Sequence, residues 1–182
     1  MLFRSWGTAP KDARNPGPNE FNTVHSIQIS KDRRLFVVDR GHRRIQVFDE
    51  NGKFLDMWNT GLRSFPYAHV ITQDQYLWTA DGGTNRIVKY DLDGHFLYGW
   101  GAPGGLPGQF GGPHSMTIDQ EGNLYIADLG NARVRLLSAD GRIRTVAGGG
   151  DIPASESSEG SPATVLKLKS PRDVLADPAG GF

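Results

Sequence analysis

Four side chains that could do chemistry recur at one position of a repeating sequence pattern. They are His25, Tyr67, His114 and Arg172, and each stands at the start of a strand-like segment. Neutral imidazole is a zinc ligand, a phenol can transfer a proton, and a guanidinium group binds carboxylates. If these side chains meet, they form the beginning of a metal site with an open position for a substrate. Whether they meet depends on the repeat that carries them.

The repeat consists of three segments that align without gaps: LFVVDRGHRRIQVFDENGKFLDMW, LWTADGGTNRIVKYDLDGHFLYGW and LYIADLGNARVRLLSADGRIRTVA. In each segment one Asp stands two residues before a Gly, five before an Arg and thirteen before a second Gly. The residues at these offsets are Asp39, Asp81 and Asp128; Gly41, Gly83 and Gly130; Arg44, Arg86 and Arg133; and Gly52, Gly94 and Gly141.

Each copy of the repeat predicts four short antiparallel strands. Runs such as LFVVD, RIQVF and KFLDMW are rich in β-branched and aromatic residues, and the glycines between them are expected to supply the positive φ of tight turns. A leading strand (HSIQIS, HVITQ or HSMTID) precedes each copy, and no segment has helical periodicity. Four strands in units of 42 and 47 residues, counted from 25 to 67 and from 67 to 114, predict an all-β fold, a β-propeller. A plain β-sandwich is the alternative, but it would not repeat its turn residues at fixed offsets.

Composition narrows the function classes. The 182 residues include 20 Lys+Arg and 20 Asp+Glu, and this zero net charge argues against a generally basic nucleic-acid binder. The absence of cysteine excludes disulfides and thiolate catalysis. No apolar run approaches the ~18 residues of a membrane span, and the opening MLFRSWGTAPKD lacks the features of a signal peptide. No compartment is therefore predicted, and a periplasmic or secreted parent protein stays open.

The pattern divides the chain into the parts of an incomplete propeller. These are an outer strand of a preceding blade (1–8), three blades (21–60, 65–101 and 110–148), a Gly/Ser-rich loop (148–169) and the start of a further blade (170–182). Three blades cannot close a ring, since propellers have four to eight. We therefore expect a piece of a larger propeller, whose partners are the remaining blades or further copies of the chain. The loop is expected to be mobile.

The pattern D-x-G-x-x-R-[IV] followed by D-x-x-G-K-F resembles the NHL repeat family over nearly the whole chain. In that family the repeated Asp and Arg generally tie together the strands of one blade. The resemblance therefore implies structural ion pairs rather than catalytic groups: Asp39–Arg44, Asp81–Arg86 and Asp128–Arg133.

The blade junctions FNTVHSI and PGQFGGPHSM, preceded by RSWG and YGWG, resemble those of peptidyl-α-hydroxyglycine α-amidating lyase and its bacterial relatives. That family is a six-bladed zinc propeller that cleaves a carbinolamide into a peptide amide and glyoxylate. The resemblance implies that His25 and His114 are zinc ligands on alternate blades and that Arg40 holds a substrate carboxylate. His25, Tyr67, His114 and Arg172, which start the leading strands, are called the head residues below. Tyr67, the phenol among them, is a second candidate for a catalytic role.

Three features differ from the lyase family. Its catalytic Tyr lies in a D-G-Y stretch, where Asp81-Gly82-Gly83 has none. Its calcium site has an Asp after one His, where Ser26 and Ser115 stand here, and its third His ligand is absent. The sequence thus predicts two of three zinc ligands, does not favour a calcium site, and leaves open whether the chain is an enzyme.

A non-catalytic scaffold is the alternative. In such a scaffold the head residues only line the central channel of the propeller. A face formed by the loops between strands would bind a protein, a carbohydrate or, less favoured, RNA. RNA would need a basic face, yet neighbouring blades do not repeat the basic run Lys31, Arg33, Arg34, Arg40, Arg43 and Arg44. Of the remaining histidines, His69 is expected to be structural and to pack where Ile27 and Met116 sit, and His42 and His95 are expected to be exposed in turns.

Overall fold

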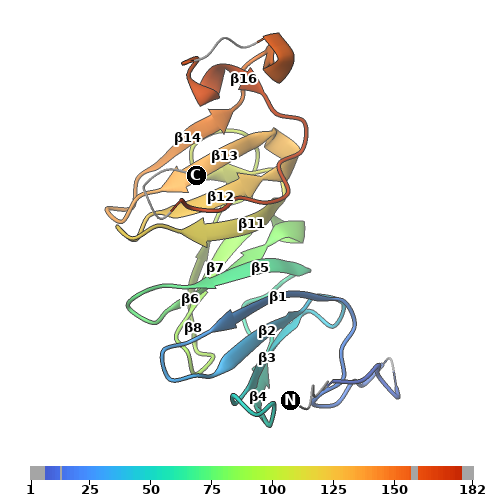
Figure 1. Ribbon diagram of the computed structural model, residues 1–182. Helices are drawn as coiled ribbons and strands as arrows, with labels where there is room; N and C mark the ends of the chain where they lie inside the picture. Colours follow the sequence, from blue (N-terminus) through green and yellow to red (C-terminus); the bar gives the residue numbers. More distant parts are fainter. Residues whose placement is uncertain (1–6, 13, 157–159, 178–182) are drawn as a thin grey trace, which may run out of the picture.

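Three four-stranded antiparallel blades stand side by side in the fold (Figure 1). The computed structural model describes residues 7–12, 14–156 and 160–177. The first blade contains β1 (Val24–Ile29), β2 (Leu35–Asp39), β3 (Arg44–Phe48) and β4 (Phe54–Trp58). The second contains β5 (Pro66–Ile71), β6 (Leu77–Asp81), β7 (Arg86–Tyr90) and β8 (Phe96–Trp100). The third contains β11 (Pro113–Ile118), β12 (Leu124–Asp128), β13 (Arg133–Leu137) and β14 (Ile143–Gly148). Strand order within each blade follows the chain, as the repeat predicts.

Short parallel ladders close the connections that lead into the first and third blades and out of the third. They are the bridge Thr8–Glu20, the pair β9 (Ala102–Pro103) with β10 (Gln109–Phe110), and the pair β15 (Ile152–Pro153) with β16 (Leu166–Lys167). The last pair lies in the segment predicted to be a mobile loop, which also holds the 3-10 turns η3 (Ala154–Glu156) and η4 (Ala163–Val165), while residues 157–159 lie outside the described part. Of the outer strand predicted at 1–8, residues 1–6 lie outside the described part as well. Among the described residues no helix is long and apolar enough to cross a membrane.

The apolar cores lie between blades rather than within them. Phe36 and Val38 of the first blade pack with Leu77 and Tyr90 of the second, and a similar cluster joins the second blade to the third. Such cores arise because both faces of a blade carry apolar residues, so each sheet needs a neighbour on either side. On the far side of the third blade, Val174 belongs to the third cluster, and the segment that contains it runs beside β11 (Figure 1).

The first repeated glycine has a different role from the predicted one. Gly41, Gly83 and Gly130 do not adopt positive φ, and the left-handed residue of this turn comes two positions later: Arg43 (φ 54°), Asn85 (58°) and Ala132 (52°). The glycine is needed because the turn passes very close to the preceding loop. Thus the Gly130 amide donates to the Gly111 carbonyl at 2.6 Å, and a Cβ at Gly130 would overlap that carbonyl oxygen. The second glycines, Gly52, Gly94 and Gly141, do have positive φ (81°, 83° and 85°), as predicted.

We predict that Gly130→Ala lowers the free energy of unfolding by about 2 kcal/mol, because a methyl group would push two backbone segments apart. The matched control is Gly105→Ala, where the nearest atom to a new Cβ is 3.8 Å away and φ is not positive. Urea unfolding of the control should change by less than about 0.5 kcal/mol. Equal losses in both variants would contradict the close-approach explanation.

A buried histidine joins the first two blades. His69 is 1% exposed, and its Nε2 donates a hydrogen bond to the carbonyl oxygen of Phe36 at 3.0 Å. It pairs with Thr79 as Ile27 pairs with Val37 and Met116 with Ile126, so its predicted packing position is confirmed. Burial, which disfavours the charged imidazolium, lowers the pKa of His69 from 6.5 to about 4.

This pKa shift predicts a pH-dependent stability. A histidine whose folded pKa is below its unfolded value takes up a proton on unfolding. The free energy of unfolding is therefore unaffected by this group above pH 6.5 and decreases as the pH falls towards 4. Between about pH 7.5 and about pH 5, His69 alone should lower the free energy of unfolding by about 2 kcal/mol. Urea unfolding at the two pH values should show this loss in the wild type and not in His69→Gln, whose amide can still donate to Phe36. An equal loss in both proteins would assign the pH dependence to other groups.

Candidate functional site

A β-bulge presents each head residue. In all three blades the ladder between the first two strands shifts register at this point: between Val24 and Ser26, between Pro66 and His69, and between Pro113 and Ser115. A bulge leaves a residue out of the ladder and turns its side chain to a new direction. The skipped positions include His25, Tyr67 and His114. Sequence reasoning missed the bulges, although a proline, which cannot donate to a ladder, directly precedes two of the three head residues.

The bulges bring the three head side chains together. The ring centroids of His25 and Tyr67 are 5.4 Å apart, those of Tyr67 and His114 are 4.8 Å apart, and those of the two histidines are 5.3 Å apart. They can meet because β5 packs against β1 on one side and β11 on the other. The convergence predicted from the repeat is therefore present in the structure.

His25, Tyr67 and His114 together are called the axial cluster. Both predicted arginines, Arg40 and Arg172, also reach it, in different ways. Nη2 of Arg40 donates to the Tyr67 hydroxyl at 3.3 Å, and the guanidinium carbon lies 4.5 Å from the centre of the Tyr67 ring. Arg172 contributes its backbone: its carbonyl oxygen lies 2.8 Å from Nδ1 of His114. Because a carbonyl only accepts, Nδ1 of His114 carries the hydrogen, and Nε2 keeps its lone pair for another partner.

The electrostatic surroundings keep His25 neutral. Burial is the main cause that lowers its pKa below 6.5, and the electrostatic interactions with His114 and Arg40 act in the same direction. A hydrogen bond with the backbone of Tyr67 opposes them in part. A neutral imidazole is the form that binds a metal ion, so His25 can act as a ligand at neutral pH.

The axial cluster fits part of a zinc site. Catalytic zinc takes three protein ligands and leaves a fourth position open. His25 and His114 could supply two, and the hydrogen bond from His114 to a carbonyl is the kind of contact that orients a metal-binding imidazole. Within the described residues there is no group of three or more His, Asp or Glu side chains that could hold a metal.

The repeated ion pair forms as predicted in the first blade only. Nε of Arg44 donates to Asp39 at 2.9 Å. In the third blade Asp128 pairs instead with Arg135, at 3.3 Å, two positions along β13 on the same face of the strand.

The two other predicted arginines bind elsewhere. Arg133, predicted to pair with Asp128, donates to the carbonyl of Gly105. Arg86 makes no ion pair with Asp81 in the part of the chain that the structure describes, and its guanidinium occupies the space that a side chain at Gly99 would fill. The prediction of these two pairs was wrong because Arg86 extends towards Gly99 and Arg133 towards Gly105, although each lies opposite its aspartate in the ladder.

The three aspartates share a different set of contacts. Each is fully buried and accepts the amide hydrogen of the residue seventeen positions earlier and a hydrogen bond from the side chain three positions later. The partners are Asn22 and His42 for Asp39, Ser64 and Thr84 for Asp81, and Gly111 and Asn131 for Asp128. The side chain of His42, expected to be exposed, is therefore buried and only 7% accessible, whereas the His95 side chain is 76% exposed, as expected. The recurrent polar residue three positions after each Asp is the sequence signal that could have revealed this.

We predict that Arg135→Met lowers the free energy of unfolding by about 3 kcal/mol, because it leaves the buried Asp128 carboxylate without its counter-ion. The matched variant Arg133→Met should cost less than about 1 kcal/mol, since that side chain only donates to a carbonyl. Chemical unfolding of both variants checks the order. A larger decrease in the free energy of unfolding for Arg133→Met would instead support the Asp128–Arg133 pair that the sequence predicted.

Three of the six cations in the basic run of the first blade are paired with carboxylates. Arg33 pairs with Glu50, Arg34 with Asp32 and Asp93, and Arg44 with Asp39. These pairs weaken the positive potential that RNA binding would require.

Sequence comparison identifies the repeat unit. Residues 110–135 match the model of the NHL repeat. The chain contains an NHL repeat. A 44-residue stretch is 48% identical to NHL repeat-containing protein 3 of Homo sapiens and 43% identical to that of Mus musculus. The stretch covers 24% of this chain and 13% of either relative, so the match spans a small part of their length.

Solved structures share the blade architecture. A protein of unknown function from Bacteroides thetaiotaomicron has a TM-score of 0.66 at 21% identity over 85% of this chain and 42% of its own. Streptogramin B lyase has a TM-score of 0.61 at 19% identity, with 86% and 46% covered, and virginiamycin B lyase from Staphylococcus aureus has 0.54 at 16%, with 67% and 40% covered. At these identities the similarity shows the fold alone. The fold is an all-β arrangement of propeller blades with an NHL repeat.

Proposed function

We propose that this chain belongs to a propeller lyase whose active site lies on the ring axis, where His25 and His114 bind zinc. The observation that supports this most is the 5.3 Å separation between two imidazole rings carried by alternate blades. The substrate class comes from the resemblance of the blade junctions to the amidating lyases and is a peptidyl-α-hydroxyglycine.

In this reaction the C–N bond breaks, the hydroxyl oxygen becomes the aldehyde oxygen of glyoxylate, and the hydroxyl proton ends on the amide nitrogen. Zinc, when bound, would polarise the hydroxyl group and lower its pKa. Arg40 would bind the substrate carboxylate through its guanidinium group, which suits a planar anion. Tyr67 lies beside both histidines, and Arg40 donates to its hydroxyl at 3.3 Å, so this hydroxyl would carry the proton towards the leaving nitrogen.

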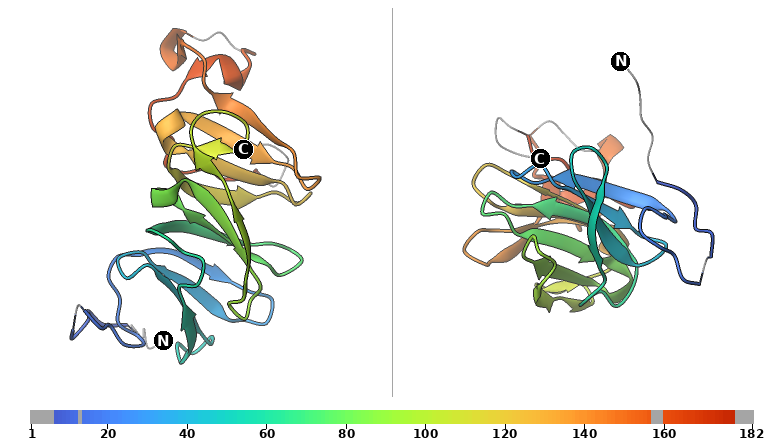
Figure 2. Two further views of the ribbon diagram at one scale, coloured as in Figure 1. Left: turned by 180° about the vertical axis from the view of Figure 1, so that it is seen from behind. Right: turned by 90° about the horizontal axis from the view of Figure 1, so that it is seen from below.

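The proposal requires a third ligand and further blades. Both would come from more of the same polypeptide or from self-association, and a ring of six blades would place alternate blades 120° apart about the axis. In support, the edge strand β1 leaves Ile27 and Ile29 51% and 65% exposed, on one side of the strand. Figure 2 shows the first and third blades at opposite ends of the stack, where added blades would dock.

Zinc binding tests the axial cluster directly. Isothermal titration of the metal-free protein with zinc chloride should show saturable binding in the wild type. His25→Ala and His114→Ala should weaken it by about 100-fold or more, because each removes a ligand. His95→Ala is the matched control, since this exposed histidine lies in the turn between β7 and β8 and pairs only with Asp91. Its zinc affinity should not change.

Activity is measured in parallel as glyoxylate released from N-benzoyl-α-hydroxyglycine. Zinc-dependent release that disappears with either histidine supports the lyase. Zinc binding that is absent, or unaffected by both substitutions, would refute it. The scaffold hypothesis, in which the cluster only lines a channel, would then remain.

A further inference from the structure

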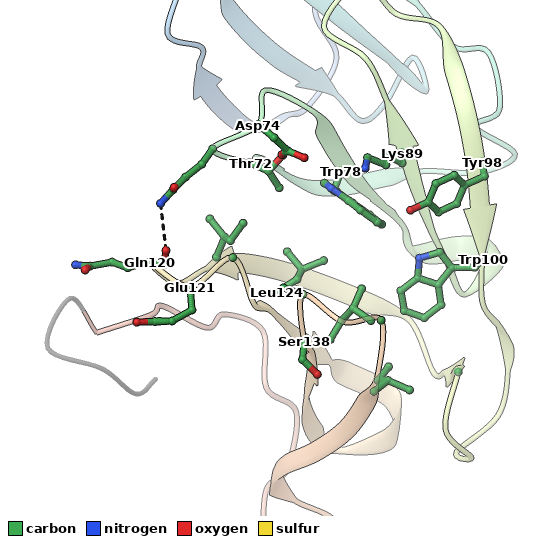
Figure 3. A pocket seen from close by; sticks show the side chains of 18 residues that line it. Thr72, Asp74, Trp78, Lys89, Tyr98, Trp100, Gln120, Glu121, Leu124 and Ser138 are labelled. Atoms are coloured by element: carbon green, nitrogen blue, oxygen red, sulfur yellow. Dashed lines mark hydrogen bonds between the residues drawn. The ribbon is translucent and has the colours of Figure 1, made fainter.

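A cleft of about 660 Å³ opens between the second and third blades, away from the axial cluster (Figure 3). It begins where the turn between β11 and β12 lies against the second blade, and there Nε2 of Gln73 donates to the carbonyl of Gln120. In the ladder of β11, His114 is near the end that pairs with Asp128, whereas this turn follows the end that pairs with Leu124. This part of the cleft is therefore at the opposite end of the blade from the proposed zinc site, and the cleft extends from there along the outer strand β8 to Trp100.

The cleft exists because two large residues of the repeat are replaced by smaller ones. Between the first and second blades, Tyr90 and Leu92 are buried in the shared core. Their equivalents in the third blade, at the same distances from the second repeated glycine, are Leu137 and Ala139, and both line the cleft. The same two repeat positions thus fill one blade interface and leave the next one open.

The second blade lines the cleft with aromatic rings. Trp78 and Tyr98 stand edge to face with centroids 5.8 Å apart, and Trp100 lies beyond them (Figure 3). The ammonium group of Lys89 is 4.9 Å from the centre of the Trp78 ring and 3.9 Å from that of Tyr76. In the first blade, the equivalents of Lys89 and Tyr98 are Val47 and Asp56, so this wall is particular to the second blade.

The opposite wall is apolar, formed by Leu124, Leu137 and Ile143 of the third blade, whereas the rim is polar and acidic. Gln120, Glu121 and Ser138 come from the third blade, and Asp74 comes from the turn between β5 and β6 (Figure 3). Carboxylates and amide oxygens accept hydrogen bonds, and the Lys89 ammonium group and the hydroxyl of Ser138 donate them. The cleft thus offers apolar surface on both sides, with hydrogen-bond donors and acceptors around it.

These features select the charge and shape of the ligand. Asp74 and Glu121 would repel an anion, and Lys89 already occupies the ring faces that would attract a cation. A neutral ligand with apolar C–H faces and hydroxyl groups around its edge meets neither penalty. Ring C–H groups of a pyranose can pack on an aromatic face, while its hydroxyls donate to carboxylates and accept from an ammonium group. We infer that this cleft binds a pyranose unit of a neutral glycan.

Titration with neutral trisaccharides tests the inference: maltotriose, cellotriose, N,N′,N″-triacetylchitotriose and mannotriose, followed by tryptophan fluorescence and calorimetry with a chelator present. At least one should bind with a dissociation constant of about 1 mM or tighter. Tyr98→Ser should weaken that binding about tenfold by removing an exposed aromatic face. Asp56→Ser, at the equivalent position of the first blade, is the matched control and should leave binding unchanged.

A second variant rebuilds the filled interface. Leu137→Tyr with Ala139→Leu should fill the cleft as Tyr90 and Leu92 do and abolish saccharide binding, with folding checked by circular dichroism. If this variant does not fold, Tyr98→Ser decides. Failure of all four sugars to bind at about 10 mM would overturn the inference. So would binding insensitive to Tyr98→Ser, or a preference for choline or indole over every sugar. Because zinc is chelated throughout, these outcomes are independent of the axial site.

Discussion

The buried aspartate at the end of each second strand is the interaction on which the remainder of the structure depends. Asp39, Asp81 and Asp128 have no exposed surface, and each accepts an amide hydrogen from the loop that enters its own blade. The amide belongs to the residue three positions before the head residue: Asn22 before His25, Ser64 before Tyr67, and Gly111 before His114. A carboxylate so placed must be satisfied by hydrogen bonds, since leaving it unpaired in the interior would be costly. The need to satisfy this charge therefore holds the loop, and the loop holds the side chain that faces the axis.

Partners of the aspartate vary from blade to blade, but the hydrogen-bonding demand does not. Arg44 and Arg135 approach two of the carboxylates from different positions, and Asp81 is satisfied by two amides and the hydroxyl of Thr84. A cation is one way to compensate a buried carboxylate, and dipoles aimed at it are another. For this reason the Asp is a better marker of the blade than the Asp–Arg pair.

The two ends of the blades differ in how they build a surface. At the axial end, bulges bring residues of adjacent blades together, so the cluster exists only because three blades stack. At the other end, the turns carry no such constraint, and side-chain volume decides whether an interface is closed or open. Leu137 and Ala139 are too small to replace Tyr90 and Leu92, and the aromatic wall of the second blade is left exposed to ligands. One repeat thereby presents a side-chain cluster at one end of the blades and an open cleft at the other without a change of fold.

The sequence alone determined the all-β blades, their strand order and the alignment of His25, Tyr67 and His114, because alternating apolar residues and turn glycines at fixed offsets are local signals. It also indicated that the head residues would meet, since equivalent positions of stacked units face a common axis. Tertiary structure decided which arginine reaches Asp128, why Gly130 must be glycine, and that His42 is buried, because each depends on the distance to a loop far away in the chain. It also decided the cleft at Trp78 and Tyr98. A cleft is space left between two surfaces, and that space depends on how the side chains of both blades pack against each other.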